Sequence, residues 1–330
     1  MLGSAVFLAL MGLALAFSSP QYKFVEEWKL WKGQHQKSYE GTLEELTRHI
    51  VWLSNKQYIE AHNQNAHIFG YTLAMNNFAD LTDQEWAEKF GTYDSDGKGN
   101  YTRYYKPDAL TYYPDSVDWR TKNAVTSVKD QSQCGASYAF SAVAAMEGAN
   151  ALATGKLTVL SEQNIIDCSV PFGNHGCKGG NMDSAFDYVI TNEGLDVSDA
   201  YPFQGKQQSC VYSDKYTGVK ISGMVRIQEG SESHLLGAVA NVGPVSVAID
   251  GSSNAFRFYD SGVYDSSRCS SSTLNHAMVV TGYGTTSDGK DYWLVKNSFG
   301  EKWGEDGYVR MVRGKYNQCG IASDASYPTL

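Results

Sequence analysis

The chain has 330 residues, 42% of them hydrophobic, and carries a formal net charge of −9 at pH 7. This length and composition allow a substantial buried core, so we expect a globular protein of one or two domains. The acidic balance disfavours nucleic acid as a partner, because binding to phosphates needs a basic surface.

The N-terminus has the features of a secretory signal peptide. Residues 1–16 are almost all apolar, and Ala14-Leu15-Ala16 offers the small-x-small pattern of a cleavage site. The apolar run is too short to span a bilayer, which argues against a membrane anchor. We therefore expect a secreted, extracellular protein with no membrane as a partner.

The next part of the chain is charged and has the periodicity of helices. Apolar residues recur at helical spacing in Glu26–Lys32 and in Leu43–Asn63. The stretch Gly91–Asn100 that follows is rich in glycine and aspartate, a composition typical of an exposed linker. Asn100 begins the only glycosylation sequon.

This organisation predicts a removable prosegment at residues 17–112 and a mature domain at residues 113–330. All six cysteines lie in the later part, and an even number in a secreted chain indicates disulfides, although six cysteines allow 15 pairings. No two cysteines have zinc-finger spacing, so we expect no metal and no cofactor. The start-like motif at residues 116–120 places the prosegment cut near Tyr112–Asp115.

The mature part begins with helical patterns and continues with strand patterns. An alanine-rich helix is predicted from Ser137 to Gly155, with shorter helices at Ser161–Cys168 and Met182–Asn192. Strand signals then dominate, at residues 244–249, 277–281, 292–296 and 307–311. A helical half followed by a β half predicts an α+β fold with a cleft between the halves.

The loop before the first of these helices has the pattern of a catalytic site. Residues 134–138, Cys-Gly-Ala-Ser-Tyr, match the nucleophile loop of a papain-type cysteine protease, except that Ser137 stands in place of the cysteine. His276 follows 139 residues later and Asn297 follows 160 residues later, close to the usual spacing. A papain-type site depends on a thiol that ionises beside histidine, which a serine hydroxyl does not do. Either the protein has lost its catalytic activity, or it catalyses a reaction with a mechanism that does not need a thiolate.

Over essentially its whole length the chain resembles the papain family, in its cathepsin L branch. The prosegment carries that branch's helix motif, with Trp52 where the family usually has phenylalanine. A second prosegment motif lies at residues 74–80, a substrate-wall motif at 176–180, and an Asn-Ser-Trp-Gly motif at 297–300 with Phe299 in place of tryptophan. The helix motif consists of Glu44, Arg48, Trp52, Asn55, Ile59 and Asn63.

The resemblance implies a papain-like fold, with a helical half, a β-barrel-like half and an inhibitory helical prosegment as an internal partner. It implies that Ser137 is the nucleophile, that His276 is the general acid and base oriented by Asn297, and that Gln131 with the Ser137 N–H forms an oxyanion hole. The disulfides would then be Cys134–Cys177, Cys168–Cys210 and Cys269–Cys319, which leaves no free thiol. The substrate-binding residues would be Gly179, Gly180, Met182, Leu274 and Asp324.

A carboxylate at Asp324 would stand where relatives have a small residue at the floor of the main specificity pocket. It would favour basic side chains there, unless Asp324 is simply a surface residue. The 22 tyrosines provide sticky surface for self-association, or are ordinary core and rim residues.

The chain resembles a sponge-spicule branch of the family in three features: the serine in the nucleophile loop, residues 161–168, and the serine run before Leu274. Its members are described as condensing silica and as forming the filament on which it is laid. The resemblance implies silicon precursors as substrates and self-association into filaments. The serine run at residues 266–273 would then offer hydroxyls for silanols, unless it is an ordinary solvated loop. A non-catalytic protein that templates mineral and a weak serine peptidase or esterase are the alternatives, and the acidic charge would repel polyanionic precursors at long range.

Overall fold

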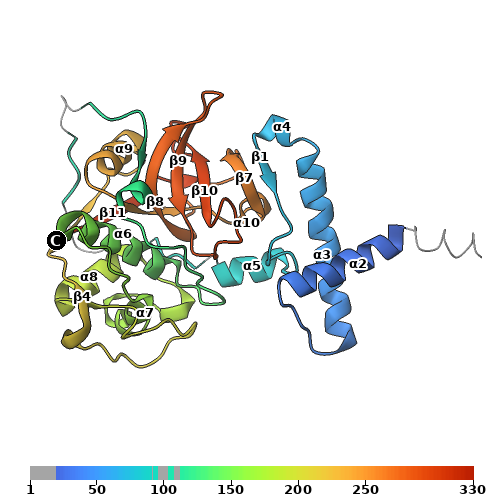
Figure 1. The fold of residues 1–330 in the computed structure, drawn as a ribbon, viewed down its shortest axis with the longest axis horizontal. Coiled ribbons are helices and arrows are strands. Elements are labelled where there is room, and N and C mark those ends of the chain that lie inside the picture. The colour runs from blue at the N-terminus through green and yellow to red at the C-terminus, as the bar shows by residue number, and fades with distance from the viewer. Residues whose placement is uncertain (1–19, 91, 96–102, 108–111) are drawn as a thin grey trace, which may run out of the picture. The chain divides into compact units, whose positions relative to one another are not determined.

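The computed structural model describes residues 20–90, 92–95, 103–107 and 112–330 (Figure 1). The predicted signal peptide and the sequon at Asn100 lie outside the described residues. The chain divides into two compact units. The first contains the residues up to Gln64 and Met75–Thr82, and the second contains Asn65–Ala74 and Asp83–Leu330.

The first unit is a pair of helices with an aromatic core. They are α2 (Pro20–Gln34) and α3 (Gly41–Asn63), and their tryptophans Trp28, Trp31 and Trp52 have ring centroids 5.3–6.3 Å apart. The buried face of α3 carries Trp52, Asn55 and Ile59, which the 3.6-residue period of a helix brings to one side. Asn55 Nδ2 donates to the carbonyls of Ala79 and Leu81, so the helix motif holds the second prosegment motif in place.

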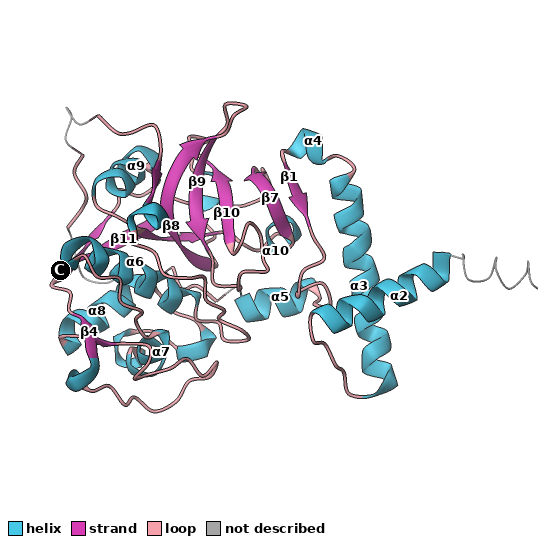
Figure 2. Ribbon diagram, in the orientation of Figure 1, coloured by secondary structure: helices cyan, strands magenta, loops and turns pink. Residues whose placement is uncertain are grey.

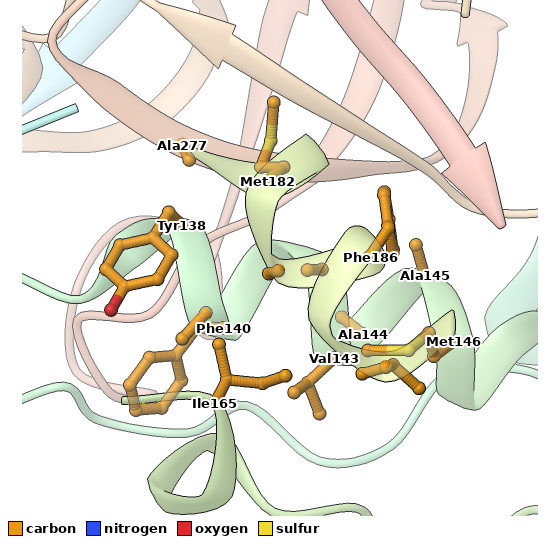
Figure 3. Close-up of a cluster of buried hydrophobic side chains, with 14 of the residues drawn as sticks. Tyr138, Phe140, Val143, Ala144, Ala145, Met146, Ile165, Met182, Phe186 and Ala277 are labelled. Atoms are coloured by element: carbon orange, nitrogen blue, oxygen red, sulfur yellow. The ribbon is translucent and has the colours of Figure 1, made fainter. Parts of the chain in front are cut away.

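The helical half of the second unit is built around α6 (Ser137–Thr154). Its side chains are short and mostly apolar, which lets neighbouring elements approach it on nearly every side. Figure 3 shows Phe140, Val143 and Met146 of α6 packed among Ile165, Met182 and Phe186. The neighbours are α7 (Glu162–Cys168), α8 (Met182–Asn192) and a small sheet of β3 (Leu195–Asp196) and β4 (Thr217–Val219).

The other half is a large, mainly antiparallel sheet with the order β1-β7-β10-β9-β8-β6-β11-β5, and β2 pairs with β8. Only β10 and β7 are parallel among the named pairs. Figure 2 shows its long strands apart from the helices α6, α7 and α8. The strands are β1 (Tyr71–Leu73), β2 (Val117–Asp118), β5 (Gly223–Arg226), β6 (Val245–Ile249), β7 (Tyr259–Tyr264), β8 (His276–Thr285), β9 (Asp291–Lys296), β10 (Tyr308–Val312) and β11 (Asp324–Thr329).

Four further helices complete the second unit: α4 (Ala66–Phe69), α5 (Asp83–Phe90), α9 (Glu232–Asn241) and α10 (Asn254–Arg257). The α+β prediction, with helical and sheet-rich halves, is confirmed. The sequence missed α9, which lies within the β half. No helix in the described part of the chain is both long and apolar enough to span a membrane.

The three disulfides have the predicted pairing, Cys134–Cys177, Cys168–Cys210 and Cys269–Cys319. Together they use all six cysteines, and no free thiol remains to replace the one that is missing at Ser137.

Candidate active site

Ser137 is the first residue of α6, and the loop before it is tightly fixed. The Cys134–Cys177 disulfide anchors the loop, and the Gly135 N–H donates to the Cys177 carbonyl at 2.9 Å. A Cβ on Gly135 would lie 2.8 Å from that same carbonyl oxygen, so the close approach needs glycine. Because Ser137 begins the helix, the helix dipole favours negative charge on its oxygen.

His276 and Asn297 lie close together because they are at the same end of two paired strands. His276 is the first residue of β8, and Asn297 directly follows β9. The His276 Nε2 lies 2.8 Å from Asn297 Oδ1, which also accepts the Ser298 N–H at 2.8 Å. Since Oδ1 can only accept, Nε2 carries the proton and Nδ1 holds a lone pair. The Phe299 ring stacks on the imidazole at 4.8 Å, where it shields this hydrogen bond from water.

Burial controls the charge of this histidine. It lowers the pKa of His276 to about 4, while the hydrogen bond to Asn297 acts in the opposite direction. The imidazole is therefore neutral at neutral and mildly acidic pH. A serine nucleophile needs such a neutral base, whereas an ionised thiol would stand beside an imidazolium.

The serine and the histidine are not hydrogen-bonded to each other in this state. Ser137 Oγ accepts the Ala277 N–H at 3.2 Å, and His276 Nδ1 has no hydrogen-bond partner among the described residues. Reaction requires the Ser137 hydroxyl to turn toward Nδ1. Catalytic hydrogen bonds often form only once substrate is bound.

Gln131 is fully buried beside the nucleophile loop. Its Nε2 donates to the Cys134 carbonyl at 3.0 Å, and its Oε1 accepts from Ser298 Oγ at 2.5 Å. These two bonds determine which way the amide points. An amide nitrogen has two hydrogens, so one N–H is available for an oxyanion.

Part of the predicted linker, Thr92–Asp94, occupies the cleft, and for these residues the expectation of an exposed segment is wrong. Tyr93 forms a parallel bridge with Gly180, and its N–H donates to the Asn275 carbonyl at 3.1 Å. The Thr92 carbonyl accepts the Gly180 N–H at 3.3 Å and lies so close to Gly179 that a Cβ there would be 2.0 Å from it. Thr92 and Tyr93 thus lie directly against Gly179 and Gly180, the two glycines of the predicted substrate wall. A composition rich in glycine and aspartate indicates only a local preference for loop structure, and hydrogen bonds to residues distant in the chain override that preference.

The side chain of Tyr93 enters a buried pocket with a charged floor. Its hydroxyl donates to Asp324 Oδ2 at 2.7 Å and accepts from Asn181 Nδ2 at 2.8 Å. Asp324 is 4% exposed, so it is not a surface residue. Arg226 pairs with Asp324 at 3.1 Å and with Asp183 at 2.7 Å. The guanidinium offsets the negative charge of Asp324, which weakens the expected preference for basic side chains.

The other two predicted pocket residues, Met182 and Leu274, belong to the same buried apolar cluster as Tyr93. Burial, and then the nearby carboxylate of Asp324, raise the pKa of the Tyr93 hydroxyl well above its ordinary value, so it remains a donor. The sequence did not indicate Asn181, Arg226 or the Ala277 amide. Each acts through a partner distant in the chain, and no local motif marks it.

Helix α5 covers the histidine. The Trp86 and Phe90 rings lie 5.5 and 5.1 Å from Phe299, and Trp86 Nε1 donates to the Gly251 carbonyl at 3.3 Å. A cavity of about 140 Å³ remains between α5 and His276. Helix α5 thus restricts access to the imidazole.

The serine run lies on a tethered loop. The Cys269–Cys319 disulfide and the Ser270 N–H, which donates to Asp250 at 2.7 Å, hold the middle of the run. Ser267, Ser271 and Ser272 are exposed and Ser266 is buried. The loop thus presents several hydroxyls to solvent, as both interpretations of the run require.

Comparison with known proteins shows the family. Residues 113–329 match the papain family cysteine protease model, and residues 28–86 match the cathepsin propeptide inhibitor domain. The chain belongs to the papain family of cysteine proteases, with a propeptide of the cathepsin type.

Two curated relatives and one solved structure show how close the similarity is. The chain is 49% identical to silicatein of Petrosia ficiformis, over 93% of this chain and 95% of that protein. It is 43% identical to cathepsin L of Sarcophaga peregrina, over 98% of both. Digestive procathepsin L 3 from the larval midgut of Tenebrio molitor has 42% identity and a TM-score of 0.87, covering 93% of this chain and 99% of that one.

Proposed function

We propose that this protein is a secreted zymogen whose mature domain hydrolyses and condenses silicon precursors through Ser137, His276, Asn297 and Gln131. The observation that carries the proposal is a neutral, buried His276 whose Nδ1 has no hydrogen-bond partner among the described residues, in a site that keeps Gln131 and Asn297 but has serine as the nucleophile. The 49% identity to a silicatein supports silicon as the element.

The proposed reaction starts when Ser137 Oγ attacks silicon and His276 Nδ1 takes its proton. The five-coordinate intermediate loses an alkoxide, which leaves as an alcohol with the proton from His276. Water or a second silanol then attacks the silyl-enzyme, and His276 Nδ1 takes the proton of the attacking O–H group. The bond between silicon and Ser137 Oγ breaks, His276 gives that proton to Oγ, and the product carries a silanol or an Si–O–Si bond. For silicic acid the leaving group is water. Gln131 and the Ser137 N–H stabilise the negative oxygen on silicon.

We further propose that the mature protein associates into extracellular filaments, such as the axial filament of a spicule. Tyr216 and Tyr316 are 44% and 97% exposed and supply aromatic surface for such contacts. Other tyrosines, among them Tyr138 and Tyr264, are core residues, so only part of the tyrosine content serves this role. Sedimentation of the processed protein at rising concentration measures the association.

The test compares variants of the processed protein on a silicon alkoxide and on a peptide ester. Ser137→Ala should lower alkoxide turnover by at least ~10³-fold, because the nucleophile is removed. Ser141→Ala, which removes a buried hydroxyl one turn further along α6, should leave turnover unchanged. Ser137→Cys should gain peptide hydrolysis if the remaining site is intact.

One observation favours a second candidate, a non-catalytic protein that templates mineral. The Ser137 hydroxyl is held by the Ala277 N–H and makes no hydrogen bond to His276. Unchanged silica deposition by Ser137→Ala would favour this template. Turnover of the peptide ester without turnover of the alkoxide would instead identify a weak serine peptidase or esterase.

A further inference from the structure

A second part of the prosegment binds the mature domain outside the cleft. Residues 103–105 lie along β5, the last strand of the large sheet, and Tyr104 forms a parallel bridge with Arg226. The Arg226 N–H donates to the Arg103 carbonyl at 2.9 Å, and the Tyr105 N–H donates to the Arg226 carbonyl at 2.8 Å. These residues satisfy backbone groups that an edge strand otherwise presents to solvent.

The side chain of Tyr105 fits a slot on helix α9. Its ring meets His234 edge to face at 6.4 Å, and its hydroxyl accepts from Asn241 Nδ2 at 3.4 Å. A Cβ on Gly237 would lie 2.7 Å from the hydroxyl oxygens of both Tyr105 and Tyr113, so the absence of a side chain at this point of α9 makes room for both tyrosines. Tyr104, in contrast, is 50% exposed. The slot selects the tyrosine at residue 105.

Arg226 joins this surface to the cleft. Its backbone holds residues 103–105, while its guanidinium pairs with Asp324, the residue that accepts the Tyr93 hydroxyl. The Arg226 side chain is 11% exposed and is also held by Asp183. One residue thus contacts the outer segment through its main chain and supports the cleft segment through its side chain.

We propose that the β5 edge and the α9 slot form an exosite for residues 103–105 of the prosegment, and that Arg226 couples occupancy of this exosite to occupancy of the Tyr93 pocket. The prosegment then binds the mature domain bivalently. Two linked contacts raise each other's effective concentration, so a cut near residues 112–115 does not by itself empty the cleft. The exosite and the pocket become free together.

Hydrogen exchange on the full chain tests the coupling without reference to catalysis. Tyr105→Ala removes the side chain from the slot and should speed exchange of the Arg226 amide. Coupling through Arg226 should also speed the Tyr93 and Asp94 amides in the cleft, on the order of tenfold. Tyr104→Ala is the matched control, because its ring is largely in solvent, and should change neither set. Unchanged β8 amides show that the variants are folded.

Reciprocity gives a second, stricter measurement. Tyr93→Phe removes only the hydroxyl that donates to Asp324, and it should speed exchange of the Arg226 and Tyr105 amides, because a coupling free energy acts in both directions. Gly237→Ala should reproduce the effect of Tyr105→Ala from the other side of the slot. Faster exchange at Arg226 alone would overturn the coupling. No change at Arg226 in Tyr105→Ala would overturn the exosite itself.

Discussion

At the scale of single residues, the proposed function gives His276 a different task once oxygen replaces sulfur at Ser137. A thiolate site keeps its proton on the imidazole, whereas a serine site needs the imidazole neutral until substrate arrives. The burial that lowers the pKa of His276 to about 4 is therefore suited to serine chemistry. In the proform, Phe299 and α5 contribute to that burial.

The shifted pKa makes the stability of the proform depend on pH. The unfolded chain protonates His276 near its ordinary value of about 6.5, but the folded chain does so only near 4. The contribution of His276 to the free energy of unfolding is therefore complete above pH 6.5. It is lost as the pH falls to 4, and the free energy of unfolding decreases by about 3 kcal/mol. His276→Gln should remove this part of the pH dependence of the free energy of unfolding, measured with denaturant between pH 4 and 7.

The control for this experiment is His67→Gln, which changes an exposed histidine. It should leave the pH dependence as it is in the unaltered protein. If the free energy of unfolding of His276→Gln changes with pH as much as that of the unaltered protein, folding does not lower the pKa of His276.

At the scale of elements, serine caps mark the start of one helix in each half of the second unit. Ser161 Oγ accepts the Asn164 N–H at 2.9 Å at the start of α7 and donates to the Tyr201 carbonyl at 2.6 Å. Ser231 caps α9 through the His234 N–H at 3.2 Å. Both are serine caps, but only the first also satisfies a distant buried carbonyl.

The two caps should differ in their contribution to stability. Ser161→Ala should lower the free energy of unfolding by about 2–3 kcal/mol, since it removes a cap and leaves a buried carbonyl unpaired. Ser231→Ala should lower it by about 1 kcal/mol, the usual value for a cap. Denaturant unfolding of both variants measures the difference, and equal losses would mean that the bond to Tyr201 contributes nothing.

At the scale of the whole molecule, the two units are stabilised by different means. All three disulfides lie in the second unit, and they join residues 42–50 positions apart. The first unit relies on its tryptophan cluster and on Asn55. Covalent links therefore stabilise only the unit that carries the candidate site.

Removing one link should affect the two units unequally. The paired change Cys269→Ala and Cys319→Ala opens a loop of about 50 residues and should cost about 4 kcal/mol in the second unit on the chain-entropy estimate. Hydrogen exchange should show weaker protection in β8 and unchanged protection around Trp52. Loss of protection in the first unit alone would contradict this division.

Much of the fold was predictable because its signals are local. The alanine-rich pattern of α6 and the apolar runs of β6, β8, β9 and β10 each indicate their structure within a few residues. The segment Thr92–Asp94 was misjudged, because its composition reports chain flexibility and not the hydrogen bonds with Gly180 and Asn275. The sequence does not decide whether Asp324 is a pocket residue or a surface residue, since its partner Arg226 is almost 100 residues away in the chain.

By itself, the sequence determined that serine stands at residue 137 in a nucleophile loop, that six cysteines can pair without remainder, and that helices precede strands. Only the tertiary structure decided that the Ser137 hydroxyl rests on the Ala277 amide, that His276 is buried and neutral, and that Arg226 lies between Tyr105 and Asp324. The reason is physical. Residue identity and local spacing are properties of neighbours in the chain, whereas burial, protonation and hydrogen-bond choice depend on groups that only folding brings together.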